Sequence, residues 1–80
     1  LVNNAGLITH GCIDWMSMAA MRELMEVNFF GQVSMVKSFL PLLIKRKDSR
    51  LVNVISAAGF YTFPNTSAYS ASKHAFLAMN

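Results

Sequence analysis

The sequence alternates two short apolar segments with two longer segments of helical periodicity. The first short segment is the opening LV, which precedes the turn formers NNAG, and the second is LVNVIS, from Leu51 to Ser56. Such short apolar and β-branched runs are typical of strands that are covered on both faces. One helix is predicted from about residue 17 to 46, and a second starts near Ser67. This order predicts an α/β domain with a parallel sheet and a right-handed crossover.

The long helix is predicted to begin after Ser17, whose side chain can cap its first turn. Its apolar positions follow the helical rhythm and are Met21, Leu24, Met25, Phe29, Val33, Val36, Leu40, Leu43 and Ile44. Gly31 and Pro41 are expected as irregularities rather than stops, since each can kink a helix without ending it. The basic residues 45 to 47 should finish the helix, because cations favour its C-terminal end.

Charge and composition argue against several classes of function. Four of the seven basic residues lie in KRKDSR, residues 45 to 50, so the net charge of +3 reflects one solvated helix end and predicts no nucleic acid partner. A lone cysteine, Cys12, excludes an internal disulfide and fits a reducing compartment. His10 and His74 lack spaced metal-ligand partners, so no metal site is predicted. The apolar run of residues 39 to 44 is too short to span a membrane, so any anchor is expected outside this segment.

Tyr69 and Lys73 lie four residues apart and share one face of the predicted second helix. An ammonium group beside a phenol favours the phenolate, which makes general acid and base roles possible. Ser56 ends the second strand, where it could donate a hydrogen bond to a carbonyl or alkoxide oxygen. Taken singly, each residue is more often structural: a half-buried aromatic, a solvated lysine and an ordinary strand-ending serine.

Asn28 shares the apolar face of the long helix, where a buried amide without partners costs about 1–3 kcal/mol. It is either a satisfied core residue that fixes a kink or a polar relay from lysine to water, and both readings require partners. The loop FYTFPNTS holds three aromatic residues between Ser56 and Tyr69. They either pack within the loop or line an apolar pocket where a substrate enters.

Together these features resemble the short-chain dehydrogenase/reductase family. The matching motifs are NNAG, a VN pair inside a long helix, a serine 13 positions before a tyrosine, and YSASK. The family often has paired serines where this chain reads Ile55 and Ser56, and the spacing selects Ser56. The resemblance implies a Rossmann-like doubly wound parallel sheet. Because the chain opens on LVNNAG and stops at FLAMN within a helical pattern, residues 1–80 are expected to be the central part of a single Rossmann-type catalytic domain, truncated at both ends.

The resemblance also implies a role for each motif in an alcohol dehydrogenase or ketoreductase. Tyr69 would be the catalytic acid and base, and Ser56 would orient and polarise the substrate oxygen. Lys73 would bind the nicotinamide ribose and support the tyrosine. Asn28 would hold a water that continues the proton relay.

The implied cofactor is NAD or NADP, and the sequence leaves that choice open. The residues implied to contact the cofactor or brace the sheet beside it are Asn3, Ala5, Gly6, Tyr69 and Lys73. The residues implied to contact the substrate, a small-molecule alcohol or ketone, are Ser56, Phe60, Tyr61 and Phe63.

Within the family, VNFFGQVSMVKSFLPLL and RLVNVIS resemble the branch of 17β-hydroxysteroid, retinol and 3-hydroxybutyrate dehydrogenases. The aromatic loop favours a lipophilic substrate, such as a steroid or retinoid, over a small hydroxy acid. The resemblance implies a homodimer or homotetramer formed through the two helices, with interface candidates Phe30, Met35, Phe39 and Phe76. A reducing intracellular compartment is expected, such as the cytoplasm, the mitochondrion or the endoplasmic reticulum membrane.

Two other interpretations remain open. The chain could be an inactive truncated piece that acts only as a self-association or interaction module, because two strands and two helices leave sheet edges and apolar faces bare. The related epimerase/dehydratase enzymes also use a tyrosine and a lysine four residues apart, but NNAG and the intrahelical Asn28 argue against them.

Overall fold

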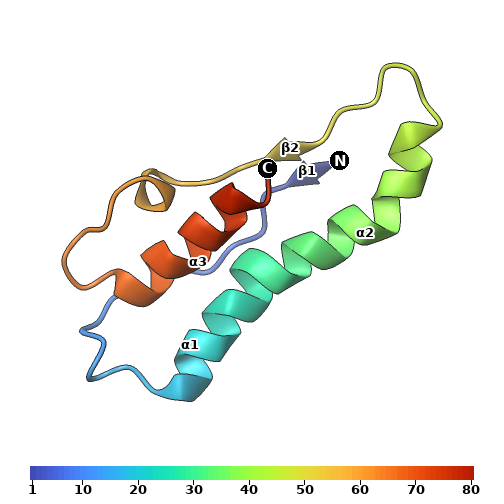
Figure 1. The fold of residues 1–80 in the computed structure, drawn as a ribbon. Coiled ribbons are helices and arrows are strands. Elements are labelled where there is room, and N and C mark those ends of the chain that lie inside the picture. The colour runs from blue at the N-terminus through green and yellow to red at the C-terminus, as the bar shows by residue number, and fades with distance from the viewer.

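The computed structural model describes all 80 residues and has the predicted order of elements (Figure 1). A strand leads into one long helix, and a second strand leads through a short turn into a second helix. The elements are β1 (Val2–Asn3), α1 (Met18–Met25), the π-helical segment η1 (Glu26–Phe30), α2 (Gly31–Ile44), β2 (Val52–Asn53), the 3-10 turn η2 (Ala57–Gly59) and α3 (Ser67–Ala78). The α/β fold class predicted from the sequence is therefore confirmed.

The two strands pair in parallel, as predicted, with Val2 opposite Val52 and Asn3 opposite Asn53. Each is only two residues long, so β2 is shorter than the predicted segment from Leu51 to Ser56. Main-chain bonds from Val52 N to Leu1 O and from Val54 N to Asn3 O, both 2.9 Å, hold the pair together.

Asparagine side chains join the strands to the end of α3. Asn3 Nδ2 donates to Asn53 Oδ1 at 2.9 Å, and Asn53 Nδ2 donates to Asn80 Oδ1 at 2.7 Å. Asn3 is 2% exposed, and its amide is paired across the sheet. This chain of amides fixes where α3 ends relative to the strands.

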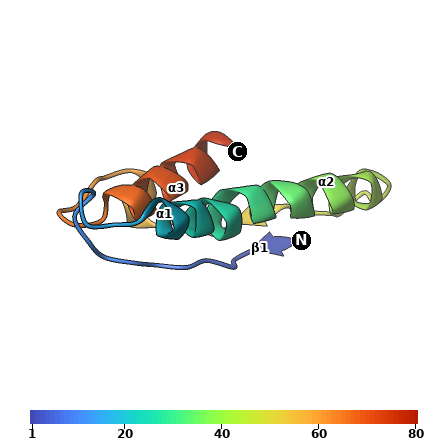
Figure 2. The same ribbon diagram turned by 90° about the horizontal axis from the view of Figure 1, so that it is seen from below.

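The prediction that both faces of the strands are covered is wrong for these 80 residues. Val2, Val52 and Val54 are 63%, 46% and 42% exposed. Figure 2 shows helices above β1 and no helix below it. The molecule is accordingly flat, with extents of 47 × 23 × 15 Å. One layer of helices cannot cover both faces of a sheet, so the apolar residues of the second face lie bare.

The long helix begins and ends as predicted. The Ser17 side chain accepts a hydrogen bond from Ala20 N at 3.1 Å, and the helix ends at Ile44 before the cations. Pro41 lies inside α2 without ending it. The irregularity is the π-helical segment η1, where Gly31 N–H donates to the carbonyl five residues earlier, that of Glu26. Such single-turn insertions widen a helix locally and often occur near functional sites.

By length and composition alone, the continuous helix of 27 residues from Met18 to Ile44 could cross a membrane. The expectation that no such segment lies in this chain rested on the run of residues 39 to 44, which is only the last part of this helix. Polar residues on this helix are nevertheless buried against the rest of the chain, since Asn28 is 0% and Gln32 is 3% exposed. This part of the helix therefore packs against the rest of the chain.

Helix α3 packs against α1, η1 and the turn η2. Phe76 is 0% exposed at this junction, with Leu24 and Ala58 also buried. The expectation that Phe76 faces another subunit is thus wrong, because its position on α3 points into the core. The other interface candidates remain accessible; Phe30, Met35 and Phe39 are 51%, 42% and 39% exposed.

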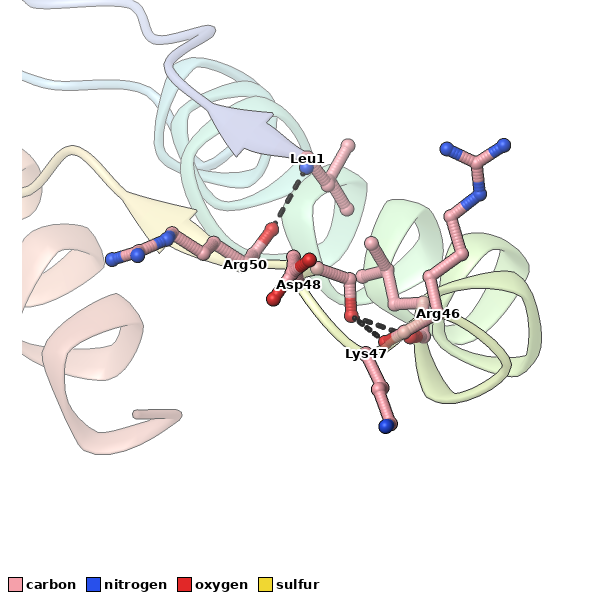
Figure 3. Close-up of a pocket in the computed structure, with 7 residues that line it drawn as sticks. Leu1, Arg46, Lys47, Asp48 and Arg50 are labelled. Atoms are coloured by element: carbon pink, nitrogen blue, oxygen red, sulfur yellow. Dashed lines mark hydrogen bonds between the residues drawn. The ribbon is translucent and has the colours of Figure 1, made fainter.

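The basic segment after α2 forms a cavity of about 430 Å³ at the end of the helix (Figure 3). Ser49 Oγ lies within hydrogen-bond distance of the carbonyl oxygens of Leu43 and Arg46, which satisfies the helix end. In Figure 3 the side chains of Arg46, Lys47 and Arg50 point in different directions. They do not converge on a common ligand, which agrees with a solvated helix end.

The change Gly31→Ala tests whether the π-helical segment requires glycine. Replacing glycine by alanine inside a helix normally stabilises a protein by about 0.5–1 kcal/mol. Here the added Cβ would lie 3.0 Å from the Glu26 carbonyl oxygen, which accepts the bond from Gly31 N–H. We therefore expect the thermal unfolding midpoint to fall instead of rise.

The matched control is Ser34→Ala, at an exposed position of α2. Helix propensity predicts a small rise in its unfolding midpoint. An equal rise for Gly31→Ala would mean that the π-helical segment does not constrain this residue.

Candidate active site

Three segments meet at the carboxyl ends of the two strands. In Figure 1 the segment after β1 (blue) and the segment after β2 (gold to orange) both run along α3. The first carries NNAG, the second carries Ser56, and α3 presents Tyr69 and Lys73. In parallel α/β sheets this edge is where ligands bind.

Lys73 is the charged residue at the centre of this region. It is 4% exposed, and its Nζ lies 5.9 Å from the centre of the Tyr69 ring and 5.5 Å from that of Phe76. No hydrogen bond or ion pair joins Nζ to another group of the chain, and the residue borders a cavity. The residue as a whole is nearly buried, but its Nζ is not among the buried unpaired atoms and lies beside the cavity, where a ligand or water can meet it.

Tyr69 borders two cavities. One of about 250 Å³ is bordered by Asn4, Gly6, Leu7, Ile8, Val54, Ile55, Tyr69 and Lys73. The other, of about 350 Å³, is bordered by Ile8, His10, Ser56, Ala57, Ala58, Phe63, Pro64, Thr66 and Tyr69. Tyr69 thus shares one cavity with Lys73 and another with Ser56.

Ser56 is held in extended conformation immediately before the turn η2. Its Oγ accepts a hydrogen bond from Ala58 N at 3.2 Å, which caps the turn. Because that bond uses an oxygen lone pair, the hydroxyl proton of Ser56 stays free to be donated into the cavity. No hydrogen bond links Ser56 to Tyr69.

Asn28 lies in the π-helical segment and is fully buried. Leu7 N donates to its Oδ1 at 2.8 Å, while its Nδ2 donates to Leu7 O at 2.9 Å and to Ser72 Oγ at 3.0 Å. Ser72 Oγ in turn donates to Tyr69 O at 2.6 Å. One amide thus ties the loop after β1 to the long helix and to the main chain of the tyrosine.

Glycine at position 6 allows close approach between this loop and the two helices. A Cβ built there would lie 3.4 Å from both Asn28 Oδ1 and Lys73 Nζ. Any larger side chain would fill the space beside the lysine, so Gly6 keeps the smaller cavity open.

The remaining sequence-predicted residues separate into those beside the cavities and those away from them. Phe63 borders the larger cavity, whereas Phe60 and Tyr61 border neither and are 61% and 69% exposed. The Asn3 side chain is hydrogen-bonded to Asn53 across the sheet, and Ala5 O accepts a hydrogen bond from Gln32 Nε2. Both contacts hold the loop after β1 in place.

Sequence analysis missed several polar residues that shape the site. Ser72 and Gln32 are buried and hold Asn28 and the NNAG segment, and His10, which was given no role, borders the larger cavity. Gln32 follows Asn28 by one helical turn, so its place on the buried face could have been found from spacing. The positions of Ser72 and His10 depend on contacts between distant segments, which spacing does not reveal.

Comparison with known proteins gives a consistent result. The model of the family described as short chain dehydrogenase matches residues 1–80. Dehydrogenase/reductase SDR family member 7B of Mus musculus is 43% identical over 75 residues, which cover 94% of this chain and 23% of the mouse protein. Mitochondrial D-beta-hydroxybutyrate dehydrogenase of Rattus norvegicus is 45% identical over 73 residues, which cover 91% of this chain and 21% of that enzyme.

A solved structure shows the same arrangement. A short chain dehydrogenase/reductase from Burkholderia phymatum in complex with NAD is 32% identical, with a TM-score of 0.92 over 98% of this chain and 28% of that one. The chain spans a quarter or less of the length of the curated relatives it matches. With a family match over its whole length, this chain belongs to the short-chain dehydrogenase family and has part of its Rossmann fold.

Proposed function

We propose that the protein carrying this chain is a nicotinamide-dependent oxidoreductase that interconverts an alcohol and a ketone or aldehyde. The observation that supports this most is the position of Tyr69 between two cavities, with Lys73 on one side and Ser56 on the other. A proton donor and acceptor placed in this way can serve a substrate in one compartment beside a cofactor in the other.

On the substrate side, Ser56 and Tyr69 act on the same oxygen atom. Ser56 donates its free hydroxyl proton to the substrate oxygen and stabilises the charge that develops there. Tyr69 takes the hydroxyl proton when the alcohol is oxidised and returns it when the carbonyl is reduced. The ammonium group of Lys73 lies nearby, with Nζ 5.9 Å from the centre of the Tyr69 ring.

On the cofactor side, the residues fit a dinucleotide. NAD or NADP would supply hydride transfer to or from the substrate carbon. Gly6 leaves a space that a Cβ would fill, and the unpaired Nζ of Lys73 borders it. Lys73 would hold the ribose hydroxyls, while Asn3, Ala5 and Gly6 keep the loop after β1 in place. An assay of hydride transfer that offers NAD and NADP separately decides between the two cofactors.

The structure narrows how Asn28 can contribute to a proton relay. Both N–H groups of its amide are used, by Leu7 O and Ser72 Oγ. A relay water therefore cannot accept a hydrogen bond from this side chain and must donate to one of the oxygen atoms of the residue. The relay proposed here runs from Tyr69 through Lys73 to such a water.

The substrate proposed is a lipophilic alcohol or ketone, such as a steroid or retinoid. The cavity beside Ser56 is bordered mainly by apolar groups, among them Ile8, Phe63 and Pro64. Phe60 and Tyr61 would take part only if the exposed loop folds over a bound substrate.

The cellular compartment that we propose is intracellular and reducing. One relative is described as mitochondrial.

Self-association is a second property that a specific observation favours. Phe30, Met35 and Phe39 are exposed along the long helix. We propose that they take part in a homodimer or homotetramer of the whole protein. The alternative, a chain that only self-associates and has no catalysis, shares this surface but predicts no cofactor binding.

Replacement of Tyr69 by phenylalanine tests the acid and base role. Tyr69→Phe removes the phenolic proton and keeps the ring, so turnover in the whole protein should fall by about 10²- to 10⁴-fold. Dinucleotide affinity, measured by quenching of protein fluorescence, should stay almost unchanged. The control is Ser34→Ala, at an exposed position of α2 outside both cavities, which should keep its activity. Equal activity in both variants would refute the assignment.

Replacement of Lys73 by methionine tests the cofactor side. Lys73→Met keeps most of the buried stem but removes a charged donor, so dinucleotide affinity should fall by about 10- to 100-fold. The unfolding midpoint should change little, because Nζ makes no hydrogen bond or ion pair within the chain and lies beside a cavity. The control is Lys37→Met, at an exposed lysine of α2. Unchanged dinucleotide affinity in Lys73→Met would contradict the proposed role.

A further inference from the structure

We infer that Ser70 and Gly59 form a clamp that sets the distance between Ser56 and the Tyr69–Lys73 pair. Ser56 precedes η2 and Tyr69 lies on α3, and no hydrogen bond joins them although they border the same cavity. Their separation must therefore be set by the contact between η2 and α3. The inference rests on the proposed function, since it concerns the geometry of that site.

Ser70 provides the polar half of the clamp. It directly follows Tyr69 in α3, is 1% exposed, and its Oγ donates to Ala58 O at 2.6 Å. The same oxygen lies 3.1 Å from Tyr61 O, at the start of the aromatic loop. His74 Nδ1 lies 2.8 Å from Ser70 O, and because a carbonyl only accepts, Nδ1 carries the proton there. A hydroxyl buried among carbonyl groups holds the turn against the helix.

Gly59 provides the steric half. A Cβ at this residue would lie 2.6 Å from Ile55 Cγ2 and 3.2 Å from the carbonyl oxygen of Lys73. Only a residue without a side chain lets the turn touch the main chain of α3 at the lysine. The two contact points, at residues 70 and 73, lie about one helical turn apart, within the stretch of α3 from Tyr69 to Lys73.

A continuous path leads from the clamp to the Ser56 hydroxyl. Ser70 Oγ donates to the carbonyl of Ala58, and the N–H of Ala58 donates to Ser56 Oγ. Ala58 thus transmits the position of α3 to Ser56 and orients its hydroxyl proton away from the turn. Ser70 and Gly59 are positioning residues, since neither borders a cavity.

The test is a double-mutant cycle of Ser70→Ala and Ser56→Ala in the whole protein. The assay uses NAD or NADP with whichever steroid, retinoid or 3-hydroxybutyrate alcohol the wild type oxidises. Ser70→Ala should lower kcat by about 10- to 100-fold, the size expected for a small misplacement of reacting groups. Because Ser70 acts through Ser56, Ser70→Ala should change kcat little when Ser56→Ala is already present.

Two further readouts separate positioning from simple loss of structure. Circular dichroism at the assay temperature must show that each variant is folded, and substrate deuterated at the carbinol carbon should show a larger isotope effect on kcat in Ser70→Ala. Gly59→Ala should lose kcat in the same way, which keeps the test decisive if Ser70→Ala does not fold. The matched control is Ser34→Ala, at an exposed position of α2, which should keep the wild-type kcat and isotope effect.

The outcomes distinguish the clamp from the proposed function. If Tyr69→Phe keeps its turnover, the proposed function fails and the clamp fails with it. If Tyr69→Phe is inactive but folded Ser70→Ala and Gly59→Ala keep wild-type kcat, only the clamp is overturned. The clamp is also overturned if Ser70→Ala lowers kcat by the same factor in the wild type and in the Ser56→Ala variant. The effect of Ser70 would then be independent of Ser56.

Discussion

The carboxamide of Asn28 joins three segments that are far apart in the sequence. Its oxygen accepts a hydrogen bond from Leu7 N, and its nitrogen donates hydrogen bonds to Leu7 O and to Ser72 Oγ on α3. Leaving such a buried amide unpaired would cost about 1–3 kcal/mol, so these segments are strongly coupled. The π-helical segment that carries Asn28 gives this part of the helix a different geometry from the rest. The loop after β1 and helix α3 are therefore held in position by the same side chain, that of Asn28.

The centre of the molecule is unusually polar for a chain so rich in apolar residues. Asn28, Gln32, Ser70 and Ser72 are almost fully buried, and each makes hydrogen bonds to another segment. Lys73 differs from them, because its side chain is nearly buried while its Nζ lies beside a cavity and makes no hydrogen bond within the chain. Polar groups that are satisfied fix the geometry, and the one that is not satisfied is available to a ligand.

Much of the fold could be predicted from the sequence because its signals are local. Helical periodicity and the Ser17 cap predicted the long helix, and YSASK with its 13-residue spacing to Ser56 selected residues that the structure brings to one place. The π-helical segment, the burial of Phe76 and the bare faces of the strands could not be predicted in the same way. The first two depend on which segments pack together, and periodicity alone does not say which face of α3 meets α1 and η1. Bare apolar faces were expected only for the interpretation as a truncated piece.

Hydride transfer by the whole protein is the central property to test. The most direct measurement follows the absorbance of reduced nicotinamide while NAD and NADP are each offered with steroid, retinoid and 3-hydroxybutyrate alcohols. We predict reduced cofactor with at least one pair, in proportion to the alcohol consumed. Tight dinucleotide binding without reduction of the cofactor in any combination, or no binding at all, would contradict the assignment of Ser56, Tyr69 and Lys73 as a catalytic site.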